Sequence, residues 1–115
     1  MNLLLILSIA SLIAKTPYDS LKYNCWDYAT DLRLALAKQN ITSRIITGIV
    51  DCNSGLFNFN ICKAFGGAHD WLDVNGVWIE ATSGELITDR SGYRAGYYSF
   101  NKFNPYKQKW KELNT

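Results

Sequence analysis

The sequence predicts an α+β domain in which one buried helix, starting at a cysteine, packs on a small antiparallel sheet. Its 115 residues are enough for a single hydrophobic core. A helix-start signal lies at Asn24-Cys25, and a hairpin signal lies at Asn75-Gly76. With 48% hydrophobic and 19% charged residues, the composition is that of a globular chain and not of a disordered one. The net charge of +2 is too small to predict nucleic-acid binding.

An apolar run, Leu3–Ala14, begins the chain and permits two interpretations. It is too short for a stable membrane span, which takes roughly 20 apolar residues. A secretory signal peptide has an apolar core of this length, although no positive side chain precedes this one. The alternative is a buried first helix that packs on the domain. Residues 1–14 are therefore considered apart from the domain of residues 15–115.

The main helix is predicted over Cys25–Lys38. Asn24 is a typical N-cap, and Asp27 three residues later completes a pair resembling a capping box. Good helix formers follow, and their apolar groups occupy more than one face, as in a helix buried among other elements. Cys25 then lies in the first turn, where unpaired backbone N–H groups and the helix dipole favour a thiolate.

The strand signals are strongest in the middle of the chain. Arg44–Val50 is rich in β-branched residues and predicts a strand. Two further runs, His69–Val74 and Val77–Thr82, flank the Asn75-Gly76 pair that type I′ hairpins prefer. Weaker patterns downstream predict short strands at Leu86–Thr88 and Tyr97–Phe100 and a terminal helix at Lys107–Leu113.

The hairpin register brings His69 and Glu80 to one face as diagonal neighbours, roughly 7–8 Å apart between backbones. A carboxylate at that position can accept a hydrogen bond from one imidazole nitrogen, hold the tautomer and stabilise the imidazolium. Asp73 shares the face but lies nearer the turn, and Asp70 points to the opposite face. Glu80 is therefore the better partner for the chain's one histidine.

Aromatic residues are expected around this pair. Trp71 and Trp78 share its face and are predicted to cover it as part of the core. A group of tyrosines toward the C-terminus is expected to pack on the hairpin's other, apolar face, with a ligand groove as the alternative. Its members are Tyr93, Tyr97, Tyr98 and Tyr106.

Three cysteines make an odd count, which predicts one free thiol and one possible disulfide. Cys52 and Cys62 bracket a loop of small and polar residues, where a short bridge is plausible. Such a bridge needs an oxidising compartment. With an N-glycosylation pattern at Asn40-Ile41-Thr42, it favours a secreted or extracytoplasmic protein. The alternative is a cytoplasmic protein whose residues 1–14 form a buried helix.

A cysteine at a helix start, a single histidine and a carboxylate beside it are the parts that nucleophilic thiol chemistry requires. The structural alternative is that Cys25 is a small buried apolar residue, the commonest role of cysteine. Metal binding by Cys25 and His69 is disfavoured because the ligand set is small and not closely spaced, so no metal or cofactor is expected.

Two blocks of the sequence resemble the transglutaminase-like superfamily, a branch of the papain-like cysteine enzymes. The first runs from Asn24-Cys25-Trp26-Asp27-Tyr28-Ala29 to a strand that ends at Gly48. The second is Ala68–Val74 followed by Val77–Thr82. In the family's order, the two blocks cover nearly half of the chain. Two departures are the small size of the domain and Glu80, which stands where the family usually has Asp.

The resemblance implies a papain-like core over residues 15–115, with Cys25 as nucleophile, His69 as base and Glu80 as third member of the triad. The function it implies is a thiol-dependent hydrolase or acyltransferase that acts on amide bonds of a peptide or protein through an acyl-enzyme. This class includes peptidases, isopeptidases and transglutaminases, and we expect a monomer. The alternative is a non-catalytic module that retains the fold and binds a peptide or glycan.

An oxyanion hole requires hydrogen-bond donors near the nucleophile. The candidates are the backbone N–H groups of Cys25 and Trp26, with possible help from the side chains of Tyr18 or Asn24.

Overall fold

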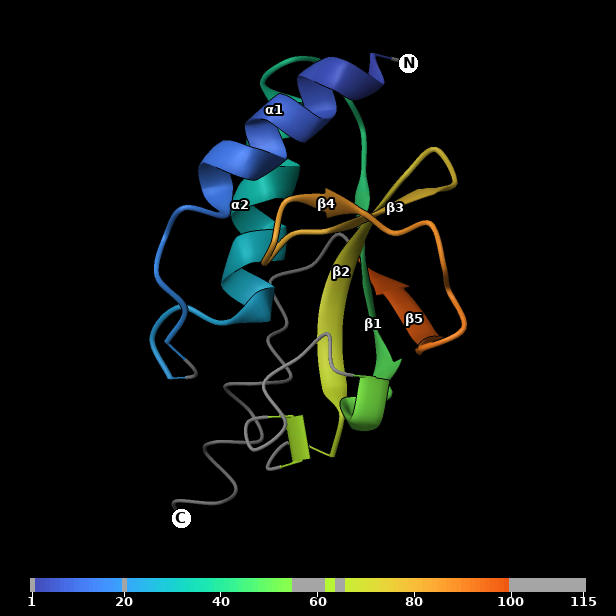
Figure 1. Cartoon of the computed structure of the whole chain (residues 1–115). Helices are drawn as coiled ribbons and strands as arrows, with labels where there is room; N and C mark the ends of the chain where they lie inside the picture. Colours follow the sequence, from blue (N-terminus) through green and yellow to red (C-terminus); the bar gives the residue numbers. More distant parts are fainter. Residues whose placement is uncertain (1, 20, 55–61, 64–65, 100–115) are drawn as a thin grey trace.

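The computed structural model describes residues 2–19, 21–54, 62–63 and 66–99 (Figure 1). Within them, two helices lie on one side of a five-stranded antiparallel sheet, which confirms the predicted α+β class. The strands follow the order β4-β3-β2-β1-β5. The element bounds are α1 (Leu3–Ile13), α2 (Cys25–Ala37), β1 (Arg44–Val50), the 3₁₀ turn η1 (Cys52–Ser54), β2 (Ala68–Val74), β3 (Val77–Glu80), β4 (Glu85–Leu86) and β5 (Tyr93–Ser99).

Helix α2 begins at the predicted residue, and the capping box forms. The side chain of Asn24 accepts a hydrogen bond from the backbone N–H of Trp26 at 3.1 Å. In return, Asp27 Oδ2 accepts one from the backbone N–H of Asn24 at 3.0 Å. The helix ends at Ala37, one residue earlier than predicted, with Lys38 as its C-cap. Cys25 is therefore the first residue of the helix.

The apolar run at the start of the chain forms α1, which packs on α2 and β4. Ile6 and Ala10 are fully buried, whereas Leu4 remains 78% exposed. Gly84 lies against this helix, since a Cβ added to it would stand 3.0 Å from backbone atoms of Ala10. No helix in the described residues has both the length and the apolar character needed to cross a membrane.

The β2–β3 hairpin has the predicted turn and register. Asn75 and Gly76 both have positive φ, 51° and 86°, as a type I′ turn requires. Val74 pairs with Val77, and the ladder continues to the pair Leu72–Ile79. Strand β3 ends at Glu80, two residues before the predicted end, because the chain turns there to start β4.

Strand β1 has its predicted bounds and lies in the sheet between β2 and β5. The two short strands predicted downstream are displaced: β4 starts one residue earlier and β5 begins at Tyr93. Strand β5 is long because it pairs along β1 from Ile45 to Val50, where it satisfies backbone groups at the outer edge of β1. The helix predicted at residues 107–113 lies outside the described residues.

The sheet has two differently covered faces. The helices cover the face that carries Leu72 and Ile79, and these join the main core cluster with α1 and α2. The other face carries a smaller aromatic cluster, which includes Trp71 and Trp78 as predicted, together with Ile46, Val50, Cys62 and the partly buried Tyr93. Tyr93 thus packs on the tryptophan face of the hairpin, opposite to the face expected for it.

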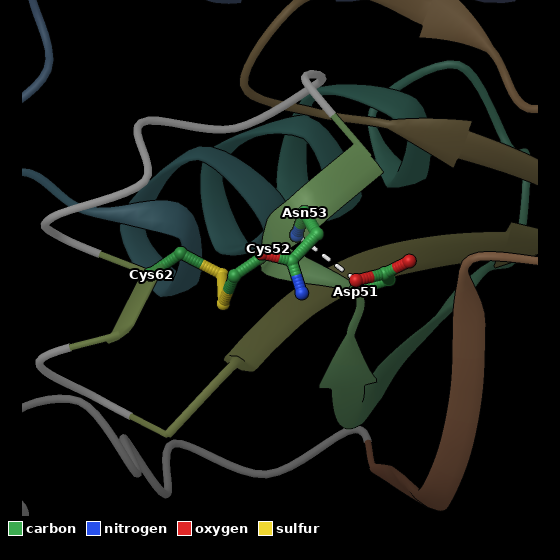
Figure 2. The surroundings of a disulfide bond; sticks show 4 residues. All are labelled: Asp51, Cys52, Asn53 and Cys62. Atoms are coloured by element: carbon green, nitrogen blue, oxygen red, sulfur yellow. Dashed lines mark hydrogen bonds between the residues drawn. A yellow bond between two sulfur atoms is a disulfide. The ribbon is translucent and has the colours of Figure 1, made fainter.

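A disulfide joins Cys52 to Cys62, as the cysteine spacing predicts, with 5.6 Å between the Cα atoms (Figure 2). It links the turn that follows β1 to a residue shortly before β2. Beside it, Asp51 Oδ1 accepts a hydrogen bond from the backbone N–H of Asn53 at 2.9 Å. Cys25 is buried and takes no part in this disulfide.

Candidate active site

The contact between His69 and Glu80 forms as the hairpin register predicts. His69 Nε2 lies 2.8 Å from Glu80 Oε1 and 2.9 Å from Oε2, so the carboxylate holds one edge of the imidazole with both oxygens. Both side chains are buried. The pair spans β2 and β3 although the two strands are not paired at these positions, because the side chains reach diagonally.

Two hydroxyl groups complete the shell of Glu80. Thr82 Oγ1 donates to Oε1 at 2.9 Å, and Tyr93 Oη donates to Oε2 at 2.8 Å. The imidazole also stacks on Trp71, with ring centroids 6.1 Å apart and planes at 26°. The carboxylate is thus fixed from β2, β5 and the turn after β3, and it in turn orients the ring of His69.

The electrostatics of this pair favour its charged form. Burial acts to lower the pKa of His69, but the charge and hydrogen bond of Glu80, and then the charge of Asp70, outweigh it and raise that pKa. Burial acts to raise the pKa of Glu80, but the charge and hydrogen bond of His69 and the two hydroxyl groups leave that pKa lowered. Both shifts favour an imidazolium–carboxylate pair over the neutral one.

The thiol of Cys25 contacts the carboxylate of Asp70, which lies on β2 next to His69. Its Sγ donates a hydrogen bond to Asp70 Oδ2 at 3.4 Å. The other oxygen, Oδ1, accepts a hydrogen bond from Thr47 Oγ1 at 2.5 Å. Thr47 stands directly opposite Asp70 in the β1–β2 ladder, so sheet register fixes this bond. Cys25 and Asp70 are both 0% exposed.

The two clusters project from neighbouring residues of one strand. Successive side chains of a strand point to opposite faces, so His69 lies on the tryptophan face and Asp70 on the face that the helices cover. The structure brings His69 and Glu80 together, and it places Cys25 against Asp70, the residue next to His69. Cys25 contacts Asp70, the third residue of β2, and His69 is the second, so both lie near the start of β2.

A glycine opposite His69 lets the backbone of β5 and the ring of Trp71 pack closely against β1. Gly48 pairs with His69 in the β1–β2 ladder, next to a register shift between β1 and β5. A Cβ at this position would stand 2.1 Å from the carbonyl oxygen of Arg94 and 2.8 Å from the ring of Trp71. Any side chain here would collide with the backbone of β5 and with the indole that supports the imidazole.

The oxyanion candidates occupy different surroundings. The backbone N–H of Trp26 donates to the capping side chain of Asn24, so the cap uses the donor that we expected for an oxyanion. Asn24 is itself fully buried. Tyr18 is 40% exposed and stacks on Tyr28, with ring centroids 6.0 Å apart.

Sequence reasoning missed three residues of the site. Asp70 was set aside because it points away from Glu80, yet this orientation is what brings it to Cys25. Thr47 could be found only from the pairing of β1 with β2. Tyr93 reaches Glu80 because β5 adds to the far edge of β1 and the chain before it crosses the tryptophan face; burial and the charge of Glu80 raise its pKa.

A cleft of about 370 Å³ lies beside the carboxylate end of the pair. Glu80 and Tyr93 form part of its wall, and the rest comes from β4 and the segment that follows it. In the part of the chain that the structure describes, no group of three or more His, Cys, Asp or Glu side chains is arranged to hold a metal ion. Compared with family models, with curated proteins and with solved structures, the chain shows no match.

Proposed function

We propose that this protein is a thiol-dependent hydrolase or acyltransferase with a papain-like core, in which Cys25, His69 and Glu80 act on an amide bond of a peptide or protein. The observation that carries the proposal is the buried His69–Glu80 pair, together with the contact of Cys25, at the start of α2, with Asp70, the residue next to His69. The three groups supply a nucleophile, a base and an orienting acid.

The geometry of the pair supports a separate role for each nitrogen of the His69 ring. Nε2 of His69 is held by Glu80, so Nδ1 is the ring atom that would exchange a proton with the thiol of Cys25. The thiolate would attack the carbonyl carbon of the amide, and the imidazolium would give its proton to the leaving amine. Water, or an acceptor amine, would then release the acyl group from Cys25 with His69 as base.

The position of Cys25 supports the thiolate. The first residue of a helix lies at the positive end of the helix dipole, which lowers the pKa of a thiol. The capping box holds this helix start in place through Asn24 and Asp27. The disulfide between Cys52 and Cys62 removes the other two cysteines from competition as nucleophiles.

The test is alkylation of the purified protein by iodoacetamide across pH, with peptide mapping. We expect selective modification of Cys25 below about pH 7, because a cysteine paired with an imidazolium has a pKa below that of a free thiol. The His69→Ala variant should lose this low-pH reactivity. Glu85→Gln, a change of an exposed carboxylate on β4 next to Glu80, is the matched control and should keep it.

Two results would contradict the proposal. One is a Cys25 that reacts with the pH dependence of an ordinary thiol, and the other is a low-pH reactivity that survives in His69→Ala. Hydrolysis of a mixed library of peptides by the wild type, but not by Cys25→Ser, would identify the substrate class. Release of free acid, compared with transfer to an added amine, separates hydrolysis from acyl transfer.

A second candidate function has its own support. Cys25 is fully buried and its thiol contacts Asp70, which suits a structural cysteine in a non-catalytic module that binds a peptide or glycan. The cleft beside Glu80 and Tyr93 would then be the binding site. Binding of a peptide or glycan that Cys25→Ser leaves unchanged, together with an unreactive Cys25, would favour this function over the enzyme.

We also propose an extracytoplasmic location, which the disulfide supports because such bonds persist in oxidising compartments. The intact mass of the protein isolated from its native source, before and after reduction and alkylation, tests this. Retention of the bridge in the isolated protein is expected, and two free thiols at positions 52 and 62 would contradict it.

A further inference from the structure

The contact between Cys25 and Asp70 has chemical consequences of its own. Asp70 is completely buried, and its two oxygens accept hydrogen bonds from two neutral groups, the Cys25 thiol and the Thr47 hydroxyl. A buried carboxylate is normally neutralised by a cation or by a proton.

The cationic side chains of β1 and β2, the two strands that carry Thr47 and Asp70, each pair with another carboxylate. Arg44 pairs with Asp73 at 2.8 Å, and His69 pairs with Glu80. The charge of His69 does act on Asp70, but Glu80 acts in the opposite direction, and burial is the largest influence and raises the pKa of Asp70. The two hydrogen-bond donors to Asp70 are neutral, so a proton on the carboxyl group is the form of neutralisation that this geometry favours.

We propose that Cys25 and Asp70 share a single proton, and that Asp70 is a positioning residue that decides when the Cys25 thiolate forms. With Asp70 ionised, the proton stays on sulfur, and the S–H group donates to Oδ2. With the proton on Oδ2, the sulfur is a thiolate that accepts the hydrogen bond from the carboxylic acid. The two states have the same net charge, and two negative charges at 3.4 Å are avoided.

This inference rests on Cys25 being the nucleophile of the proposed function, and it assigns a control to that nucleophile. The groups that face Asp70 are Cys25 from α2, Thr47 from β1, the neighbouring His69 on β2 and, at longer range, Glu80 from β3. Ionised Asp70 keeps Cys25 as an unreactive thiol, whereas protonated Asp70 leaves Cys25 as the thiolate. Asp70 thus acts through Cys25 and does not touch the reacting amide.

The test is the pH titration of the ultraviolet absorbance of the thiolate, with Cys25→Ser as the blank. This measurement does not need a reagent to reach the buried sulfur, and the disulfide leaves Cys25 as the thiol that titrates. Asp70→Asn replaces the carboxylate by an amide of the same shape. Its oxygen can still accept from Thr47, and its NH₂ group then faces the sulfur.

We expect Asp70→Asn to lower the midpoint of thiolate formation by about one pH unit or more, because a like charge beside the sulfur has been removed. The thiolate fraction below the midpoint should rise about tenfold, since one pH unit is a factor of ten. Asp73→Asn, the same change on the same strand at the Arg44 pair, is the matched control and should leave the midpoint unchanged.

A second variant tests the same inference if Asp70→Asn fails to fold. Thr47→Val removes the hydroxyl that stabilises ionised Asp70 without altering β2, so Asp70 should keep its proton more readily and the Cys25 midpoint should again fall, by less. An unchanged midpoint in both variants, or an equal shift in Asp73→Asn, would overturn the inference.

His69→Ala separates this inference from the proposed function. If the midpoint shifts in His69→Ala but not in Asp70→Asn or Thr47→Val, the thiolate–imidazole pair is supported and the shared proton is contradicted. If the midpoint shifts only in Asp70→Asn and Thr47→Val, the shared proton is supported and the role of His69 as the base of Cys25 is contradicted.

Discussion

A buried carboxylate lies on each side of strand β2, and the two carboxylates have different partners. On the tryptophan side, buried Glu80 meets an imidazolium and two hydroxyl groups, and its pKa falls. On the helix side, buried Asp70 meets a thiol and a hydroxyl, and its pKa rises. The two carboxylates are similarly buried, so the difference comes from the partners and not from the depth.

This difference shows what each side of the strand can do. A carboxylate paired with a cation is charged over a wide pH range and serves to hold the ring of His69 in place. A carboxylate with neutral donors keeps or loses a proton according to its neighbours, and it passes that change to Cys25. One side is thus suited to orientation and the other to control of a proton.

Removing the acid from the tryptophan side should have the largest effect. Glu80→Ala leaves the His69 imidazolium buried without its partner, so we expect a loss of about 3–5 kcal/mol in the free energy of unfolding. Chemical denaturation at mildly acidic pH measures this. Glu85→Ala, its exposed neighbour across the β3–β4 ladder, is expected to change stability by no more than about 0.5 kcal/mol. Equal losses in both variants would show that the pair contributes nothing specific.

Crowding the same side should have the next largest effect. Gly48→Ala places a methyl group against the carbonyl of Arg94 and the ring of Trp71, with a cost of about 1–3 kcal/mol or more. The nearest atom to a Cβ at Gly92 lies 4.0 Å away, so Gly92→Ala should be tolerated. Thermal unfolding of the two variants compares them directly, and a Gly48→Ala protein as stable as Gly92→Ala would contradict the close approach.

The pH dependence of stability sharpens the comparison. The raised pKa of His69 adds stability that is complete below its unfolded value of 6.5 and is lost as pH rises through the folded value. The lowered pKa of Glu80 adds stability above its unfolded value of 4.5, which is lost as pH falls through the folded value. The stability gap between wild type and Glu80→Gln should therefore be widest between pH 4.5 and 6.5 and narrow on both sides. Denaturation at a series of pH values measures it, and a gap that grows above pH 8 would contradict the pair.

The smallest effect is expected at the start of α2. Asn24→Ala removes the cap that holds Cys25 in place and should cost about 1 kcal/mol. Asn24→Ser retains an oxygen that can accept from the backbone of Trp26 and should recover part of this loss. Denaturation gives the stability, and the thiolate titration of Cys25 shows whether fraying of the cap also raises the midpoint. Equal stability of the alanine variant and the wild type would show that the cap is dispensable.

Local signals were sufficient where the interacting residues are close in sequence. The capping box needs only the four residues Asn24 to Asp27, and the chemistry of each is explicit in its side chain. The contact of His69 with Glu80 follows from a two-residue turn, because Asn75 and Gly76 both adopt the positive φ that sets the register. The disulfide is another short-range feature, since its cysteines are ten residues apart.

The sequence by itself therefore determined the helix start at Cys25, the hairpin and the residues that share each of its faces. Only the tertiary structure decided that β1 lies beside β2, which brings Thr47 to Asp70, and that α2 crosses the sheet so that Cys25 reaches the same carboxylate. These partners are 23 and 45 residues apart, and no short-range pattern encodes such contacts. They depend on which faces the helices and strands bury together, which is a property of the whole core.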